Sequence, residues 1–585
     1  MILKSDYHSL KSCTGKISKL RIKIFSLLMG LVCSFAIAAP TTSLETVTTI
    51  EEFQSTITGT ITDASGVPLP GANVVIKGTS TGAAADFDGN YTIQASPGDV
   101  LVFSYTGYNS TEITVGTSNV INVTLEEGLT LDEVVVTGYT VESKRETTAA
   151  VSIVSAEELA AIPSGNVEQQ LAGRVAGVTV ITNGQPGTAS QVRVRGYGGF
   201  GGNQPLYIVD GVPIQDIGFL SPDDIATTTV LKDAAAASIY GARAANGVIV
   251  YTTKQGARGD RKTNISINIQ SGGTDPNVAG SPKMLSPQDM AEWTHIAYRN
   301  NAAANGTTPQ YTHPQYGSNA TPTFPDYLHA DGLNGVSASD INLAQIRANY
   351  EADPENVFLI QPNLAGTNWY REITRIAPAL RANIGFDGGN ENGRFYIGLS
   401  MQSLDGILLA NSQDRFTARF NSEFDLAPWL SVGENLQMTY NSVVGQTGAN
   451  GGQGIANDES EVLSAYRMPT IIPVFDDFGS YASTRAAGFN NPRNPVRRLE
   501  QDRGDDVAFS ASVFGNFYAL IKPFDGFTFR SSIGGYYFNF TNRDYNYRYL
   551  GDSEPQASFT FSEGSNYGFS WTFTNTITYE KLFAD

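Results

Sequence analysis

A chain of 585 residues can hold several domains. Its 57 acidic residues outnumber 38 basic ones, for a formal net charge of −19, and this excludes nucleic acid as the natural partner. The basic residues are unevenly distributed, with a group of them within residues 4–23.

Residues 1–38 have the pattern of an export signal. The basic group precedes an apolar run that ends in Ala36-Ile37-Ala38, and the run is shorter than the roughly 20 residues that a membrane-spanning helix needs. We therefore predict a signal peptide. Because Cys13 and Cys33 both lie within it, the mature chain has no disulfide, thiol nucleophile or cysteine-based metal site. No other run of about 18 apolar residues occurs, so a membrane could be crossed only by a closed β-barrel.

Residues 55–127 predict a small β-sandwich. Short runs rich in β-branched residues are separated by turn sequences at residues 63–66 and 86–90, and this spacing is typical of a sandwich. Asp86 and Asp88 match the start of a calcium loop, but no glutamate closes it, so we predict a turn. The unit resembles the carboxypeptidase-regulatory-like domain family, which implies a transthyretin-like fold.

An acidic and then β-branched segment follows at residues 131–138. It has no core of its own, and an extended peptide of this kind can add as a strand to the exposed sheet edge of a partner. An ordinary strand of the neighbouring domain fits the pattern equally well. The segment resembles the TonB box that precedes the plug in TonB-dependent outer-membrane receptors. This resemblance assigns TonB binding to Asp132, Glu133, Val134, Val135, Val136 and Thr137.

Residues 140–256 predict a compact α+β plug domain, because short strands alternate with glycine turns and short helices. Ser155 and Glu158 form a capping box before the first helix. Asn166 is placed to cap a second one. The glycine-rich stretch at residues 196–201 matches a dinucleotide fingerprint, but a strand follows it where that fingerprint needs a helix, so we predict a loop.

The sequence from residue 262 to residue 585 has the residue pattern of membrane β-strands. Segments of about ten residues alternate apolar and polar side chains and are rich in Phe and Tyr, as in outer-membrane barrels. The connections alternate between tight and long, as periplasmic turns and outer loops do. We predict eight strands, over residues 264–270, 379–387, 395–403, 416–426, 430–441, 507–521, 527–540 and 569–579.

The regulatory-like domain, the TonB box and the plug signatures occur in one order that closely resembles the SusC/RagA family of TonB-linked outer-membrane proteins. The resemblance implies a mainly β fold, with an N-terminal transthyretin-like β-sandwich, an α+β plug domain and a partial antiparallel transmembrane β-barrel. It implies an outer-membrane location among lipid, and no cofactor. The positions that match the plug signatures are Arg193, Arg195, Gly196, Asp210, Gly211, Gly241, Asn246 and Gly247.

We expect these signature residues to be structural rather than ligand-binding. Arg193 and Arg195 can pair with carboxylates of the barrel wall, since buried paired charges usually mark packing. Asp210 and Gly211 form a turn that needs a glycine.

The long outer connections carry whatever substrate chemistry exists. Aromatic side chains there could stack on sugar rings or grip a peptide, with loop packing or an interfacial position as the competing interpretation. These candidates are Trp293, Tyr311, Trp369 and Tyr370. The histidines His295, His313 and His329 lack zinc-ligand spacing, and no group of catalytic residues is recognisable. We therefore predict neither a metal site nor an enzyme.

Eight strands are too few for the wall of a plugged transporter, which has 22 strands in the group that this family resembles. An open sheet edge cannot face lipid, because its unpaired backbone groups each cost several kcal/mol there. We therefore expect the chain to be truncated or split from its remainder.

The leading hypothesis is TonB-dependent import of a large nutrient, an oligosaccharide or a peptide, together with a SusD-like surface lipoprotein. TonB would engage residues 131–138 in the periplasm. The alternatives are import of a siderophore or cobalamin, and a surface adhesin or sensor that does not transport.

Overall fold

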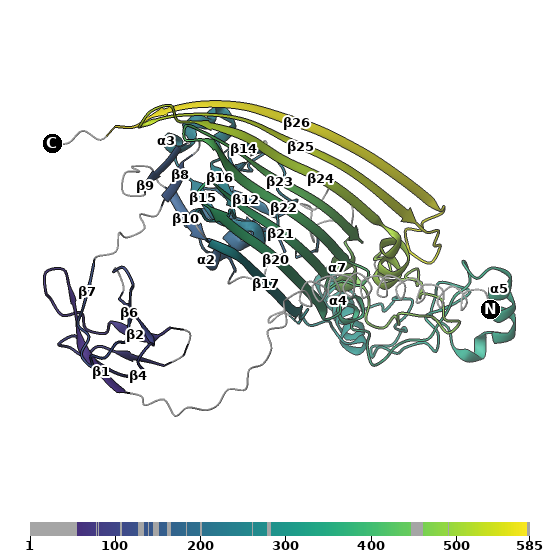
Figure 1. The fold of residues 1–585 in the computed structure, drawn as a ribbon. Coiled ribbons are helices and arrows are strands. Elements are labelled where there is room, and N and C mark those ends of the chain that lie inside the picture. Colours follow the sequence, from purple (N-terminus) through teal and green to yellow (C-terminus); the bar gives the residue numbers. More distant parts are fainter. Residues whose placement is uncertain are drawn as a thin grey trace, which may run out of the picture. The chain divides into compact units, whose positions relative to one another are not determined.

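The computed structural model describes residues 55–77, 79, 81–105, 108–126, 134–137, 140–143, 151–160, 165–182, 184–198, 202–259, 261–277, 282–445, 460–489 and 491–581. The predicted signal peptide lies outside these residues. The chain divides into two compact units, Met1–Leu131 and Asp132–Asp585, and Figure 1 labels the elements of both. None of the described helices is long and apolar enough to cross a membrane.

The described part of the first unit is a sandwich of two short sheets. Its strands are β1 (Ser55–Asp63), β2 (Asn73–Ile76), β3 (Gly82–Ala84), β4 (Asn90–Ala95), β5 (Val100–Ser104), β6 (Thr111–Thr114) and β7 (Val123–Leu125). One sheet has the order β4-β1-β7 and the other β3-β2-β5-β6. Alternate side chains such as Ile57, Ile61, Leu101 and Phe103 are fully buried between them, which confirms the predicted sandwich.

Both predicted turns of this unit are held by aspartates. The Asp63 carboxylate accepts hydrogen bonds from the following amides of Ser65 and Val67 at 2.9 and 2.8 Å. Asp86 accepts in the same way from Asp88 and Asn90 at 3.0 and 2.8 Å. These backbone hydrogen bonds lower the pKa of both carboxyls, because they favour the charged form. The Asp86 segment is therefore a turn, as predicted.

The second unit begins with a strand pair and a plug. Its elements are β8 (Val134–Thr137), β9 (Thr140–Ser143), β10 (Val151–Ser155), α2 (Ala156–Ala160), η1 (Gln169–Leu171), β11 (Val178–Ile181), β12 (Gln191–Val194), β13 (Leu206–Val209), β14 (Val212–Ile214), η2 (Pro222–Asp224), β15 (Ile225–Leu231), α3 (Ala234–Ala237), η3 (Ser238–Ala244) and β16 (Val248–Thr253). A five-stranded sheet in the order β10-β15-β16-β13-β14 forms its centre. Only β13 and β16 are parallel neighbours in that sheet.

Local sequence signals set the short helices of the plug. The Ser155 amide donates to the Glu158 carboxylate at 3.0 Å, and the Glu158 amide donates to the Ser155 hydroxyl at 3.4 Å, which confirms the capping box before α2. The Asn166 side chain accepts from the Gln169 amide at 2.9 Å at the start of η1. The second predicted helix is therefore one turn of 3-10 helix.

The rest of the unit is an antiparallel sheet with its strands in sequence order. They are β17 (Arg261–Thr274), β20 (Ala377–Asn390), β21 (Gly393–Asp405), β22 (Ser412–Ala427), β23 (Leu430–Val444), β24 (Val507–Ile521), β25 (Phe527–Asn546) and β26 (Thr560–Tyr579). All eight predicted strands are present. The sheet curves around the plug and stays open between β17 and β26 (Figure 1), so it is a partial barrel.

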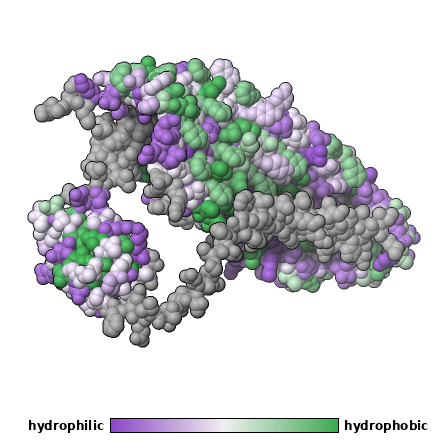
Figure 2. All heavy atoms as spheres, viewed as in Figure 1, coloured by the Kyte–Doolittle hydropathy of each residue, from purple (hydrophilic) through white to green (hydrophobic). Residues whose placement is uncertain are grey.

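Side chains of the barrel strands alternate between the plug and the outer surface. The inward side chains of β22 are polar and buried, and include Gln413, Arg415, Thr417, Arg419 and Asn421. The outward ones are mainly apolar, and include Phe416, Ala418, Phe420 and Phe424. Figure 2 shows apolar residues gathered over these strands. This is the pattern of a barrel wall that meets lipid outside and a polar plug inside.

The long connections of the sheet fold into a common cluster. It contains α4 (Pro287–Asn305), β18 (His329–Ala330), η4 (Ala338–Asp340), α5 (Leu343–Ala352), β19 (Leu359–Ile360), α6 (Trp369–Ile373), α7 (Glu461–Arg467), α8 (Pro495–Arg497) and the π-helical η6 (Arg498–Arg503). Buried side chains from distant loops, among them Tyr316, Phe358, Ile472 and Val496, form one core. We call this set of connections the loop cluster.

Candidate functional site

The described part of the predicted TonB box is strand β8. It pairs antiparallel with β9, from Val134 opposite Ser143 to Thr137 opposite Thr140. Asp132 and Glu133 lie outside the described residues. The pair is a two-stranded sheet of its own rather than part of the plug sheet. Among the described strands, β8 therefore hydrogen-bonds to β9 alone, and its other edge has no strand partner.

The signature residues Asp210 and Gly211 form the two-residue turn between β13 and β14. Both have positive φ angles, 48° and 86°, which is the geometry of a type I′ hairpin and favours glycine. The Asp210 carboxylate is turned back into the plug, where it accepts from the Thr253 amide at 2.9 Å and the Thr253 hydroxyl at 2.8 Å. Its carbonyl accepts from Asn516 of the barrel at 2.9 Å. The turn thus ties the plug to the wall.

Arg419 of β22 is the charged centre of the plug–barrel contact. It is 0% exposed, and its guanidinium lies 3.6 Å from the carboxylates of Asp210 and Asp224 of the plug. It also donates to Gln437 of β23. Burial raises the pKa of both aspartates, and the Arg419 charge opposes that shift. All three side chains are buried, so this is a desolvated cluster of one cation between two carboxylates.

Further contacts join the plug to the inner face of the wall. We call these contacts, together with those of Arg419, the seam. Arg381 pairs with Asp223 of the plug at 3.4 Å. Arg415 donates to the carbonyls of Gly165 and Gly218 at 3.0 and 3.3 Å. Two more hydrogen bonds belong to the seam: Thr439 donates to the Phe219 carbonyl at 2.9 Å, and Asn421 donates to the Lys254 carbonyl at 2.7 Å. The Phe219 ring also stacks on Phe514, with their centroids 5.2 Å apart.

The expected ion pairs of Arg193 and Arg195 with barrel carboxylates are not formed among the described residues. Arg193 donates to Gln191 at 3.0 Å, and its guanidinium lies 4.1 Å from the centroid of the Tyr197 ring. The amide of Arg195 donates to the Gly177 carbonyl at 2.7 Å. In the seam that the structure describes, the arginines stand on the barrel and the carboxylates on the plug. Pairing of Arg193 and Arg195 with carboxylates of the wall stays a prediction.

The remaining signature residues shape the plug backbone. Gly196, Gly241 and Gly247 have positive φ angles of 93°, 67° and 88°, which glycine adopts without strain. Asn246 donates to the Gly202 carbonyl at 2.9 Å and so fixes the loop before β13. These contacts fit the structural role that the sequence suggests for them.

Arg415 and Arg419 were missed from the sequence, although a signal was present. They are four residues apart in a strand whose alternate positions are apolar, so both must face inward. A charge at an inward barrel position needs a partner on the plug.

The segment between the plug and β17 is fixed to the end of the wall that carries the tight turns. A Cβ atom on Gly256 would lie 2.3 Å from the Phe395 carbonyl oxygen, so only glycine fits there. Arg258 binds Glu423 at 2.7 Å and also pairs with Asp425. Glu423 in turn pairs with Arg394 at 3.3 Å. We call residues 254–259 the strap.

The predicted aromatic substrate residues lie in the loop cluster, but they differ in exposure. Trp369 is 0% exposed and donates from Nε1 to the Pro469 carbonyl at 3.1 Å, so its assignment as a substrate contact is wrong and it is a core residue. Tyr311 packs 4.6 Å from the His295 ring, and Tyr370 donates to the Pro276 carbonyl at 3.1 Å. Trp293 is 60% exposed. A substrate role for these three stays a prediction.

The contacts of this arrangement hold the plug against the wall. Within the described ranges, no group of three or more His, Cys, Asp or Glu side chains could hold a metal ion. The seam instead consists mainly of ion pairs and hydrogen bonds between the plug and the wall.

Comparisons with known proteins agree with this architecture. The TonB-dependent receptor plug domain matches residues 143–248, and the CarboxypepD_reg-like domain matches residues 57–136. TonB-dependent receptor P39 of Formosa agariphila is 32% identical over 542 residues, which cover 91% of this chain and 45% of that protein. TonB-dependent receptor SusC of Bacteroides thetaiotaomicron is 29% identical over 520 residues, which cover 83% and 44%.

A solved structure gives the same picture. The RagAB peptide importer in its open-open state has a TM-score of 0.58 at 26% identity, and the match covers 76% of this chain and 47% of that one. A plug domain within an antiparallel wall is the architecture of TonB-dependent receptors. The chain belongs to the SusC/RagA-like receptors of that class, whose members are outer-membrane β-barrels. It spans about half the length of the relatives that it matches.

Proposed function

We propose that the protein imports a large nutrient across the outer membrane and that TonB drives the import. The observation that carries this proposal is the polar seam around Arg419, which holds a small plug inside the wall by contacts that water can replace. A plug held by apolar packing alone would have no such route of release. Strand β8, with one edge paired and one open, is a suitable handle for the periplasmic partner.

We further propose an oligosaccharide or peptide as the substrate and a SusD-like lipoprotein as the partner at the outer face. Uncharged amides on the inner wall support this substrate class. Gln402 donates to Gln413 at 3.2 Å, and Gln413 donates to Asn441 at 2.8 Å. Such a row can offer hydrogen bonds to hydroxyl or peptide groups. The RagAB relative is itself described as a peptide importer.

Deletion of residues 131–138 in the full-length protein tests the TonB-driven role. Uptake of labelled substrate by cells should be lost, while binding of the substrate to purified protein stays unchanged. Val136→Pro should have the same effect, because Val136 is a non-hydrogen-bonded partner of Val141 in the β8–β9 pair and proline there removes a backbone donor from the open edge of β8. Leu129→Pro, just before the segment, is the control. Normal uptake by the deletion variant would refute the proposal, and co-purification of a surface lipoprotein would support the partner.

A further inference from the structure

One carboxylate lies in the middle of the apolar outer surface of the wall, away from its ends. Gly534 and Phe514 face the plug, since a Cβ on Gly534 would touch Val212 and the Phe514 ring stacks on Phe219. Their neighbours along each strand therefore face outward. By the same alternation Glu434 of β23 faces outward, directly opposite Phe517 of β24.

Glu434 has a hydrogen-bond donor but no cation. The hydroxyl of Ser422, directly across on β22, donates to both carboxylate oxygens at 2.6 Å. No lysine or arginine pairs with Glu434 among the described residues. Among the described outward positions of β20–β26, the basic side chain is that of Arg543. It lies near the outer end of the wall and pairs with Glu563 at 3.2 Å. The chain does not neutralise this charge within the described wall.

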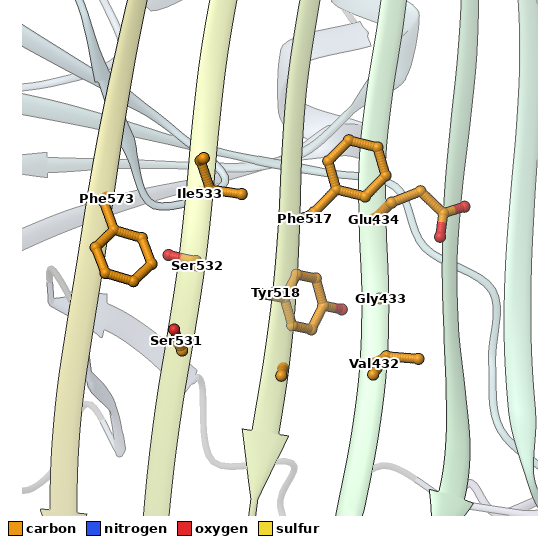
Figure 3. A pocket seen from close by; sticks show the side chains of 10 residues that line it. Val432, Gly433, Glu434, Phe517, Tyr518, Ser531, Ser532, Ile533 and Phe573 are labelled. Carbon is orange, nitrogen blue, oxygen red and sulfur yellow. The ribbon is translucent and has the colours of Figure 1, made fainter.

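A cavity of about 340 Å³ opens beside this carboxylate. Figure 3 shows Glu434, Phe517, Ile533 and Phe573 on four neighbouring strands around it. The three apolar side chains are 57%, 50% and 59% exposed, and they form one row with Glu434 at its end. The cavity thus has apolar walls and one acidic end, which suits an aliphatic stem with a cationic tip.

The depth of Glu434 decides what can fill the cavity. Trp429, in the turn just before β23, and Tyr440, towards the other end of the strand, are both about half exposed. They flank the apolar part of its outward face, as girdle residues do. Five residues separate Glu434 from Trp429, roughly 12 Å of depth at about 3.3 Å per residue and a tilt of about 45°. An apolar band is about 25 Å tall, so the amine of a lipid headgroup lies too far away to reach the carboxylate.

We propose that this cavity is a docking site for a lysine or arginine on the lipid-facing surface of a second membrane-embedded protein. A charged group at such depth is costly and marks a functional contact by default. A basic side chain held at the same depth by a neighbouring chain would satisfy it. A second copy meeting this same face would bring two Glu434 carboxylates together, which disfavours that arrangement. The proposal requires the wall to lie in the membrane, but it does not depend on transport.

Photo-crosslinking in the outer membrane tests the site in the full-length protein. A benzoylphenylalanine at Ile533 should give one protein adduct, and the cross-linked partner peptide should contain a lysine or arginine. Glu434→Gln should lower the adduct yield by about tenfold or more, the scale for removing one partner of a desolvated ion pair. Phe517→Lys should do the same, because it supplies the cation from within the chain.

Two matched controls define specificity. Asp414 also faces outward and accepts from the hydroxyl of Ser403 at 2.6 Å, but near the outer end of the wall, so Asp414→Asn should leave the yield unchanged. The same probe at Leu399 of β21 should give no such adduct. Adducts with lipid alone, or a protein adduct that both Glu434→Gln and Phe517→Lys leave unchanged, would overturn the proposal. Heat-modifiable mobility of each variant shows that its barrel is assembled.

Discussion

Arg419 joins two parts of the chain that are distant in sequence. Its carboxylate partners precede it by about two hundred residues, and the shortest ion-pair distances are 3.6 Å. At that separation the attraction is appreciable only because the cluster is dry, so its members depend on one another. Loss of the cation would leave two buried carboxylates without this partner.

We predict that Arg419→Met destabilises the seated plug by about 3–5 kcal/mol, the usual cost of breaking a buried ion pair. Thermal unfolding and limited proteolysis of the full-length protein measure this loss. Adding Asp210→Asn and Asp224→Asn should recover part of it, because no buried carboxylate is then left without its cation. Arg543→Met, which breaks an ion pair about half exposed on both sides, should cost no more than about 1 kcal/mol. Equal effects of the two arginine variants would contradict the role of Arg419.

Gly256 tests the strap at the same scale. We predict that Gly256→Ala loosens the strap, because the new methyl group would lie within 3 Å of the backbone of Phe395 and Gly388, and backbone cannot move aside as a side chain can. Proteolysis near residue 256 should then become faster. Gly272→Ala is the control, since no atom lies within 4 Å of a Cβ placed there. Unchanged cleavage in Gly256→Ala would contradict this prediction, because it would show that the strap accommodates the methyl group.

At the scale of elements, the loop cluster is a packed body with a buried acid in one turn. Asp476 is 7% exposed. One of its oxygens accepts from the amides of Phe478 and Ser480 at 3.0 and 2.8 Å, while the other has no hydrogen-bond partner among the described residues. Burial raises the pKa of Asp476 to about 6, so this turn responds to pH near neutrality.

We predict that the loop cluster loses stability as pH rises from 5 to 7.5. The folded pKa of Asp476 exceeds the unfolded value of about 3.9, so its contribution is fully present below pH 4 and is lost as pH passes 6. The whole loss above pH 4 is at most about 3 kcal/mol, and roughly half of it falls between pH 5 and 7.5. Hydrogen exchange of residues 460–489, corrected for intrinsic rates, measures it, and Asp476→Asn should remove the dependence.

The N-terminal unit is the internal reference for that measurement. Asp63 and Asp86 have lowered pKa values, so their contribution is complete above the unfolded pKa and does not change between pH 5 and 7.5. A parallel loss of protection in both units would contradict the role of Asp476.

The elements were largely predictable because alternation is a local property. All eight wall strands were found, yet their ends were not. The predicted connection at residues 541–568 is shorter in the structure, because β25 runs to Asn546 and β26 begins at Thr560. Pairing between those two strands extends them beyond the apolar segment, and the sequence pattern registers only the part that meets lipid.

At the scale of the whole molecule, the proposed function requires the plug to move relative to the wall. Val212 of β14 and Gly534 of β25 touch across the seam, and a Cβ on Gly534 would lie 3.2 Å from that of Val212. This is close to the separation of about 3.5–4.5 Å that a disulfide spans. Both cysteines of the given sequence lie in the predicted signal peptide, so no thiol within residues 39–585 would compete with an added pair.

We predict that a Val212→Cys, Gly534→Cys disulfide in the full-length protein abolishes uptake while substrate binding persists, because the plug is locked to the wall. A reductant should restore uptake. Val513→Cys with Tyr537→Cys joins two neighbouring wall strands and should leave uptake normal. Undiminished uptake by the oxidised plug–wall pair would show that the substrate passes without displacement of the plug.

The sequence by itself determined the order of domains, the number of wall strands and the face on which each side chain lies, because these follow from local turns and from a repeat of two residues. It could not determine which charges pair, since the partners of Arg419 are set by the register of the barrel against the plug. It also could not separate Trp369, a buried core residue, from the exposed Trp293. Only the tertiary structure decided these points, because burial and ion pairing depend on segments that meet after folding.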